Sequence, residues 1–457
     1  MATNISGGQV HAPPRLKRVL GFWDLMFYGI VIIQPTAPLP SFGIVNTVSR
    51  GHAVSAILLA MFAMMLTAYS YGKMARAYPT AGSAYTFVGR ELHPNLGLLT
   101  GWCITLDYVL SSTIGVIWCS KAAMNIAPLP FIAWAAFFAI VFGFVNLMGI
   151  RMNARTNAFL TIGMFSVLIA FFVAAASYLF HRAGVAALFS SLPFYNPSTF
   201  AWNRLRAGTS IAVLTYMGFD SISTLSEDVK DPQRNIMLAT VSLCLFTGIL
   251  GGLEVYAGQL IWPDFRTYPD LDTAFVSVAG RAAGPWMFYT MNFTLLIATV
   301  GSSIGAQLGS VRLLYAMGRD NVISRRFFGV LEPLRNTPRN NILLTSTLMF
   351  AGALFLSYQL GAELLNYGAF VAFMGVNLSS AKRALLVDMS RNALTRAVTV
   401  ALPFTGFLVC LYIWWSLSTM AKIAGTGWLL MGVIYCAART RMFRLRLELV
   451  SSPDQDG

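Results

Sequence analysis

The stretch GFWDLMFYGIVIIQPTAPLPSFGIV, residues 21–45, is apolar enough to cross a membrane but has three prolines at its centre, Pro35, Pro38 and Pro40. Each proline lacks an N–H group and its ring clashes with the preceding helical turn, so this run excludes a continuous α-helix. Hydrocarbon cannot satisfy free backbone polar groups, and a break inside a membrane helix must be buried in protein or line a cavity. We therefore predict a break near residues 34–40 that marks a functional position.

The composition indicates a protein that crosses the membrane many times. Of the 457 residues, 56% are hydrophobic and 11% are charged, and the mean hydropathy is +0.63. This leaves too little polar surface to cover soluble domains, and it excludes a disordered chain. The five cysteines all lie in apolar runs, so we expect free thiols rather than a disulfide framework. The net charge is +14, and the lysines and arginines lie mostly between apolar runs. Membrane topology explains this distribution better than binding to nucleic acid, so we do not expect nucleic acid as a partner.

Apolar stretches of the length that spans a bilayer occur twelve times along the chain. They fall at residues 22–48, 51–75, 97–126, 131–149, 155–181, 208–228, 235–262, 284–318, 341–358, 362–386, 395–416 and 420–439. Most of the 32 lysines and arginines lie in the segments on one side of these stretches. The positive-inside rule therefore predicts a multi-pass protein of the cytoplasmic (inner) cell membrane with both termini in the cytoplasm and with membrane lipid around it.

The sixth apolar stretch has a second interruption. In SIAVLTYMGFDSISTLSED, residues 210–228, Gly218 and Asp220 lie in the middle of the span. A charge at that depth is costly and usually faces a cavity, although a lone glycine can also serve close helix packing. Interrupted first and sixth spans are expected where spans 1–5 and 6–10 are inverted repeats that hold a substrate between two discontinuous helices.

That pattern predicts five segments. They are a cytoplasmic tail (1–20), a first repeat (21–182), a second repeat (183–390), two further helices (391–440) and a second cytoplasmic tail (441–457). The fold class predicted is an all-α integral membrane protein with twelve helices.

Several motifs, in order along the chain, resemble those of the amino acid, polyamine and organocation permeases. They are YGKMARAYPTAGSAY (71–85) with Gly101-Trp102, YMGFD (216–220) with EDVKDPQRN (227–235), RLLYAMGRD (312–320) with Thr337-Pro338, and NYGA (366–369) with NLS (377–379). The resemblance implies the leucine-transporter fold, with discontinuous helices 1 and 6 and with helices 11 and 12 outside the repeats. It also implies secondary active transport of amines or amino acids by alternating access.

The first break departs from the pattern of the amino acid permeases in this family. Their break is commonly Gly-Ser-Gly, whose N–H groups hold a substrate carboxylate. When Phe22-Trp23-Asp24 is placed on the motif that it resembles in this family, Pro35-Thr36-Ala37 occupies the position of the break instead. The prolines offer no N–H group, while freed carbonyls and the oxygens of Gln34 and Thr36 suit an ammonium group. The segment also resembles the putrescine-importer branch. We expect import of a small organic amine or polyamine, and the alternative is an amino acid permease or exchanger.

The remaining candidates for substrate contact are aromatic or acidic. Tyr216 and Phe219, beside the second break, could form an aromatic gate and bind an ammonium group by cation–π contact. Glu254 could attract the second ammonium group of a diamine or could pair with another helix. The complete predicted substrate site is Gln34, Pro35, Thr36, Ala37, Tyr108, Tyr216, Gly218, Phe219, Asp220 and Glu254.

The resemblance leaves the coupling ion open between a proton and sodium. Proton-coupled relatives often carry a lysine on helix 5, where this chain has Met164 and no lysine occurs in 155–181. Asp107, at a position that is often acidic in the family, is a candidate proton carrier, unless it belongs to a polar network or lines a cytoplasmic vestibule. Ser302 and Ser303 could supply hydroxyl groups to a sodium ion, although serines in spans more often serve packing.

Two other classes of membrane protein fit the sequence poorly. An enzyme or metal centre would need a cluster of His or Cys, but His11, His52, His93 and His181 lie in tails or loops, so we expect no catalysis, cofactor or metal. A channel would conduct without saturation, which transport measurements can test.

Overall fold

The computed structural model describes residues 19–78, 83–149, 154–226, 228–319, 323–332, 335, 337–387 and 393–439. The predicted tails therefore lie outside the described residues except for Val19 and Leu20, and so do positions 79–82 of the first motif.

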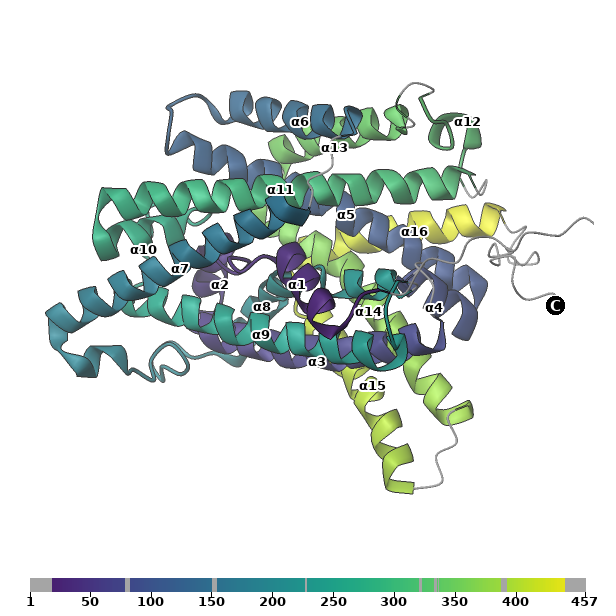
Figure 1. Cartoon of the computed structure of the whole chain (residues 1–457), viewed down its shortest axis with the longest axis horizontal. Helices are drawn as coiled ribbons and strands as arrows, with labels where there is room; N and C mark the ends of the chain where they lie inside the picture. The colour runs from purple at the N-terminus through teal and green to yellow at the C-terminus, as the bar shows by residue number, and fades with distance from the viewer. Residues whose placement is uncertain are drawn as a thin grey trace, which may run out of the picture.

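The described part of the chain is helical, apart from turns, loops and one isolated β-bridge between Leu20 and Val229. Its α-helices (Figure 1) are α1 (Phe22–Ile33), α2 (Phe42–Val48), α3 (Ala53–Ala77), α4 (Ser83–Glu91), α5 (Pro94–Met124), α6 (Phe131–Leu147), α7 (Ala154–Ala183), α8 (Trp202–Ala212), α9 (Pro232–Ile261), α10 (Ala274–Ala283), α11 (Pro285–Arg319), α12 (Arg325–Phe328), α13 (Arg339–Phe355), α14 (Tyr358–Leu386), α15 (Ala393–Trp414) and α16 (Thr419–Arg439). Three 3₁₀ helices accompany them, namely η1 (Val185–Leu188), η2 (Val213–Tyr216) and η3 (Phe219–Leu225).

Eight of these helices are long and apolar enough to cross a membrane, by length and composition alone. They are α3, α5, α7, α9, α11, α14, α15 and α16, while α1, α6 and α10 are apolar but shorter. Figure 1 shows α3, α9 and α11 running along one axis of the molecule, with α4 and α12 at one end and α10 at the other, whereas α15 projects away from this direction.

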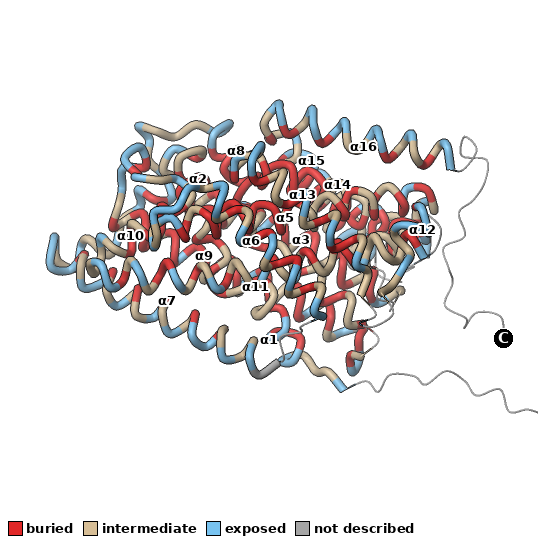
Figure 2. The backbone as a smooth tube through the Cα atoms, turned by 90° about the horizontal axis from the view of Figure 1, so that it is seen from above, coloured by how far each residue is buried: buried red, intermediate tan, exposed pale blue. Residues whose placement is uncertain are grey.

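Buried residues fill the centre of the bundle, and the outer helices α7 and α16 alternate between buried and exposed positions (Figure 2). The exposed side chains along the middle of α7 include the apolar Phe159, Ile162 and Ile169. Exposed apolar surface of this extent on a long helix suits contact with lipid hydrocarbon.

The first break lies where the prolines predicted it. Helix α1 ends at Ile33, Gln34 takes a positive φ of 70°, and helix α2 begins only at Phe42. Between them the chain forms tight turns, in which the Ala37 N–H donates to the Gln34 carbonyl at 3.2 Å and the Leu39 N–H donates to the Thr36 carbonyl at 3.1 Å. The prolines thus replace helix by turns over residues 34–41.

The second break lies at Gly218, between η2 and η3. Gly218 has a φ of +105°, a conformation that residues with a Cβ rarely adopt. A methyl group placed on Gly218 would also lie 2.7 Å from Cγ2 of Ile32, near the end of α1. Gly218 therefore allows both the turn and the close approach of the two breaks.

The substitution Gly218→Ala should destabilise the fold by about 1–3 kcal/mol, because alanine would be strained at this φ and would clash with Ile32. Thermal unfolding of the purified protein in detergent measures the effect. The control is Gly163→Ala on α7, where nothing lies within 4 Å of the added methyl group, and which should be neutral or slightly stabilising. Equal midpoints for both variants would contradict the proposed constraint.

Helix α9 runs along α1, the first break and α2 in turn. A methyl group on Gly29 of α1 would meet Leu243, and one on Gly251 of α9 would lie 3.1 Å from Pro38 in the break. One on Gly258 would lie 3.1 Å from Phe42 of α2. The residues of α9 between positions 243 and 258 that lie on this face are therefore directed at the break.

Candidate functional site

The first break is fixed against α11 by a side chain within it. The Gln34 Nε2 group donates a hydrogen bond of 2.7 Å to the carbonyl of Ala298. One N–H of the amide is used in this bond, and the amide oxygen accepts no hydrogen bond from the described residues. Sequence reasoning predicted Gln34 as a substrate ligand but did not predict this contact with α11.

The break also leaves backbone acceptors free. Among the described residues, no hydrogen bond ends on the carbonyl of Ile32 or Ile33, at the end of α1. Pro35 and Thr36 are buried, and Gln34 and Pro35 line a cavity of about 10 Å³ together with Thr247 and Leu250 of α9. A cavity of this size holds about one water molecule. This cavity is therefore too small to hold an organic substrate in this conformation.

Glu254 lies on the face of α9 that is directed at the break, between Gly251 and Gly258. Its side chain is 0% exposed, and neither carboxyl oxygen has a hydrogen-bond partner among the described residues. The hydroxyl group of Thr215, next to Gly251, is buried and unpartnered in the same way. An isolated buried carboxylate costs several kcal/mol or more, so this position calls for a proton or a cation.

Asp107 and Asp220 form a second acidic position, partly buried, on α5 and η3. Their carboxylates are within electrostatic range of each other, and Asp220 is also within range of Tyr108 and Tyr28. The Asp107 carboxylate accepts no hydrogen bond from the described residues, whereas the Asp220 carboxylate accepts from the backbone N–H groups of Asp220 and Ser221. The structure thus brings together Asp107, Tyr108 and Asp220, which were predicted from separate motifs.

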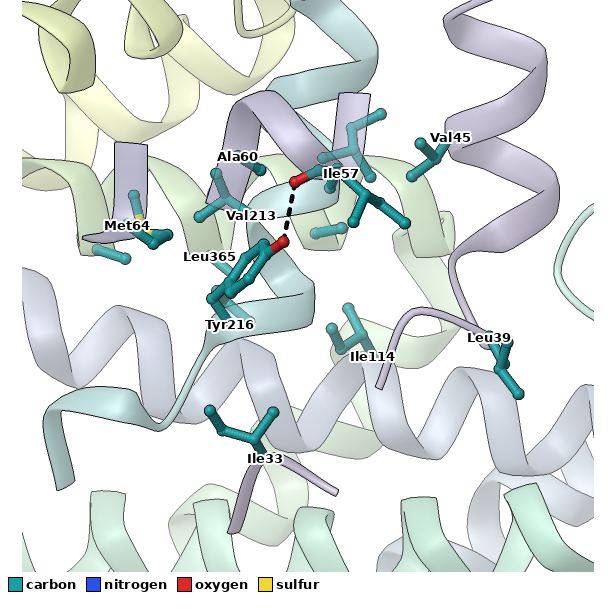
Figure 3. Close-up of a cluster of buried hydrophobic side chains, with 14 of the residues drawn as sticks. Ile33, Leu39, Val45, Ile57, Ala60, Met64, Ile114, Val213, Tyr216 and Leu365 are labelled. Atoms are coloured by element: carbon teal, nitrogen blue, oxygen red, sulfur yellow. Dashed lines mark hydrogen bonds between the residues drawn. The ribbon is translucent and has the colours of Figure 1, made fainter. Parts of the chain in front are cut away.

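The two aromatic candidates beside the second break are engaged in packing. The hydroxyl group of Tyr216 donates to the carbonyl of Ile57 on α3 at 2.8 Å, within a buried apolar cluster (Figure 3). Phe219 is fully buried, with ring centroids 5.5 Å from Tyr71 and 5.4 Å from Phe373. Their role as a gate stays a prediction, and in this conformation both side chains hold η2 and η3 in place.

The two serines proposed for sodium binding lie on different sides of α11. Ser302 is exposed, whereas Ser303 is buried against Gly115 of α5. Both hydroxyl groups donate to the Thr299 carbonyl, at 3.1 and 2.6 Å. Gly115 is eight residues, or about 12 Å, from Asp107 along α5, so Ser303 does not lie beside that carboxylate.

A segment that sequence reasoning missed covers α2. In the segment before α10, the Tyr268 hydroxyl group accepts a hydrogen bond of 2.7 Å from Asn46 of α2. Helix α10 also contacts α2, because the ring centroid of Phe275 lies 5.2 Å from that of Phe42. The segment is tied to α5 by an ion pair of 3.1 Å between Lys121 and Asp270. Asparagine inside an apolar run was the available signal, since a buried amide needs a partner.

Asp272, in this same segment, has an altered acidity. Burial, and then the neighbouring Asp270 carboxylate, raise the pKa of Asp272 from its usual 3.8 to about 6, against the opposing effect of Lys121. A raised pKa in the folded state means that the contribution to stability is present at low pH and is lost as the pH rises through about 6.

We expect the wild-type protein to lose about 2–3 kcal/mol of stability from this group between pH 4 and pH 7. The variant Asp272→Asn should lose less over the same interval, because asparagine does not titrate. Thermal unfolding at both pH values measures the difference, with Asp264→Asn, at an exposed aspartate of the same loop, as the control. An equal loss in wild type and Asp272→Asn would contradict the assignment.

Fold and site together define a polytopic membrane protein with acidic side chains held inside its helical bundle. Residues 40–438 match the profile of the amino acid permease family, and the chain belongs to that family. Its members are transporters, as the motifs predicted.

Relatives that align along most of the chain include transporters of amines and of amino acids. The low-affinity putrescine importer PlaP of Escherichia coli K12 is 31% identical over 441 residues, which cover 94% of this chain and 95% of the importer. The branched-chain amino acid permease BcaP of Lactococcus lactis subsp. cremoris MG1363 is 26% identical, with 94% of this chain and 96% of the permease covered. The vacuolar cationic amino acid transporter 4 of Arabidopsis thaliana is 26% identical, with 80% and 63% covered.

Proposed function

We propose that this permease imports a small organic amine or polyamine, such as putrescine, across the cytoplasmic membrane by alternating access. The observation that carries the proposal is that carboxyl groups are directed at the breaks. Asp107 and Asp220 lie beside the second break, and Glu254 faces the first. Carboxylates shielded from water favour an ammonium group strongly and oppose a substrate carboxylate.

The backbone of the first break supports the same substrate. Pro35 and Pro38 have no N–H group to offer a carboxylate. The free carbonyls of Ile32 and Ile33 and the Gln34 amide oxygen are acceptors, which suit the three N–H donors of an ammonium group. The 31% identity with a putrescine importer is consistent with this choice.

The proposal includes an architecture that explains alternating access. In it, α1 with α2 and α8 with η2 and η3 each form one interrupted crossing, and these belong to two inverted repeats at 21–182 and 183–390. The contact between Gly218 and Ile32 supports a site between the interrupted crossings. Ten further crossings, two of them in 391–440, and both termini in the cytoplasm complete the topology.

The driving ion in this proposal is a proton or sodium, moved together with the substrate. Asp107 is the candidate for the proton, because its carboxylate is partly buried and lacks a hydrogen-bond partner among the described residues. The exposed position of Ser302 makes a sodium site at Ser302 and Ser303 the weaker alternative.

A permease or exchanger of amino acids is the second candidate, favoured by the relatives that carry branched-chain or cationic amino acids. Uptake of labelled putrescine and of labelled amino acids into proteoliposomes, under imposed proton or sodium gradients, separates the two. Saturable putrescine uptake supports the proposal. Uptake of amino acids without putrescine would overturn it.

A further inference from the structure

Two acidic positions lie at opposite ends of the first break. At one end, Ile222 of η3 and Leu243 of α9 both approach Gly29 of α1. Asp220 precedes Ile222 by two residues and therefore lies at the level of α1, and Asp107 is within electrostatic range of it. At the other end, Glu254 faces the chain between Pro38 and Phe42.

The separation of these ends follows from the geometry of α9. Glu254 lies eleven residues beyond Leu243, which corresponds to about 16 Å along a helix. Side chains of a helix tilt toward its start, so the Glu254 carboxyl group lies nearer to the level of Leu243 than its Cα atom does. A molecule with a single ammonium group can satisfy only one end.

Glu254 gives the independent reason to place a charge at the far end. Its side chain is fully buried, both of its oxygens are unpartnered among the described residues, and the unpartnered Thr215 hydroxyl group lies on the same side of the break. The free-energy cost of burying this carboxylate is reduced most by a cation that arrives with the substrate and forms a charge-assisted hydrogen bond with it.

Resting on the proposed amine transport, we propose that the site selects α,ω-diamines: one ammonium group is held at Asp107 and Asp220, and the other is held by Glu254. The carbon chain between them lies along the apolar wall of the break, where Pro35 and Leu250 line the small cavity. Glu254 is thus the residue that distinguishes diamines from monoamines. A monoamine leaves its carboxylate unpaired.

The test compares matched substrates in proteoliposomes. Uptake of 1-butylamine and of 1,3-diaminopropane, putrescine and cadaverine gives kcat/KM for each. In the wild type, we expect the best diamine to exceed butylamine by about tenfold or more, the usual effect of one further charge-assisted hydrogen bond.

In Glu254→Gln, kcat/KM for that diamine should fall about tenfold while that for butylamine stays within about twofold, so the preference disappears. Retained butylamine uptake shows that the variant is folded. Glu254→Asp keeps the charge but withdraws it by one methylene group, and should shift the optimum toward a longer diamine.

Three results would overturn this assignment. They are an absence of diamine preference in the wild type, equal losses for butylamine and the diamine in Glu254→Gln, or an unchanged length optimum in Glu254→Asp. Each leaves amine transport itself intact. If no amine is transported but amino acids are, the proposed function fails instead, so the two failures are distinguishable.

Discussion

The substitution Asp220→Asn should lower kcat/KM for putrescine uptake by about 10- to 100-fold. Asparagine is nearly the same size but has no charge, so an ammonium group at the second break loses a charge-assisted interaction in a site shielded from water. The Asp220 carboxylate accepts from the backbone N–H groups of Asp220 and Ser221, and the amide oxygen of asparagine can accept the same bonds, so the backbone of η3 should persist. Initial rates of labelled putrescine uptake into proteoliposomes measure the effect.

The matched control for this prediction is Asp264→Asn. Asp264 is exposed in the loop between α9 and α10, so the same chemical change there should leave uptake within about twofold. Both variants are compared at equal reconstituted protein. Uptake by Asp220→Asn at the control level would show that the carboxylate at the second break does not hold the substrate.

The sequence was sufficient to predict the positions of both breaks. Pro35, Pro38 and Pro40 remove donors and clash with a helix whatever their surroundings, and α1 accordingly ends at Ile33. Gly218 was the second signal, and its positive φ is a property of glycine itself. Such local rules depend only on neighbouring residues, which is why they can be applied before the fold is known.

The rotation of each helix about its axis could not be predicted in the same way. Ser302 and Ser303 are adjacent in sequence, yet one is exposed and the other is buried against Gly115, because successive residues on a helix point about 100° apart. Tyr216 likewise lies next to the break but donates to Ile57, a contact with α3 that no local motif encodes.

The short helices were also missed, for a different reason. Helices α4 and α10, of 9 and 10 residues, are too short to appear in a search for stretches that span a membrane. Each becomes visible only through its contacts, as when Phe275 of α10 packs on Phe42. Hydropathy alone therefore could not predict that α10 and the segment before it pack on α2.

The second large effect concerns energy coupling, and it is expected in Asp107→Asn. A gradient of one pH unit supplies about 1.4 kcal/mol for each proton, enough for about a tenfold change in accumulation of substrate. We expect the wild type to accumulate putrescine in response to an inward proton gradient. Asp107→Asn should lose this response while retaining uptake driven by a membrane potential, because asparagine cannot carry a proton.

The reason for choosing Asp107 over Asp220 lies in their surroundings. Two carboxylates in electrostatic range of each other repel strongly away from water, and a proton on one of them relieves that repulsion while the other binds the ammonium group. Asp220 lies on a short 3₁₀ helix beside the second break, where it can follow the substrate, whereas Asp107 lies within the long helix α5. Persistent proton-driven accumulation in Asp107→Asn would show that Asp107 does not carry the proton. Accumulation that is driven by sodium instead, and that is lost in Ser303→Ala, would assign coupling to α11.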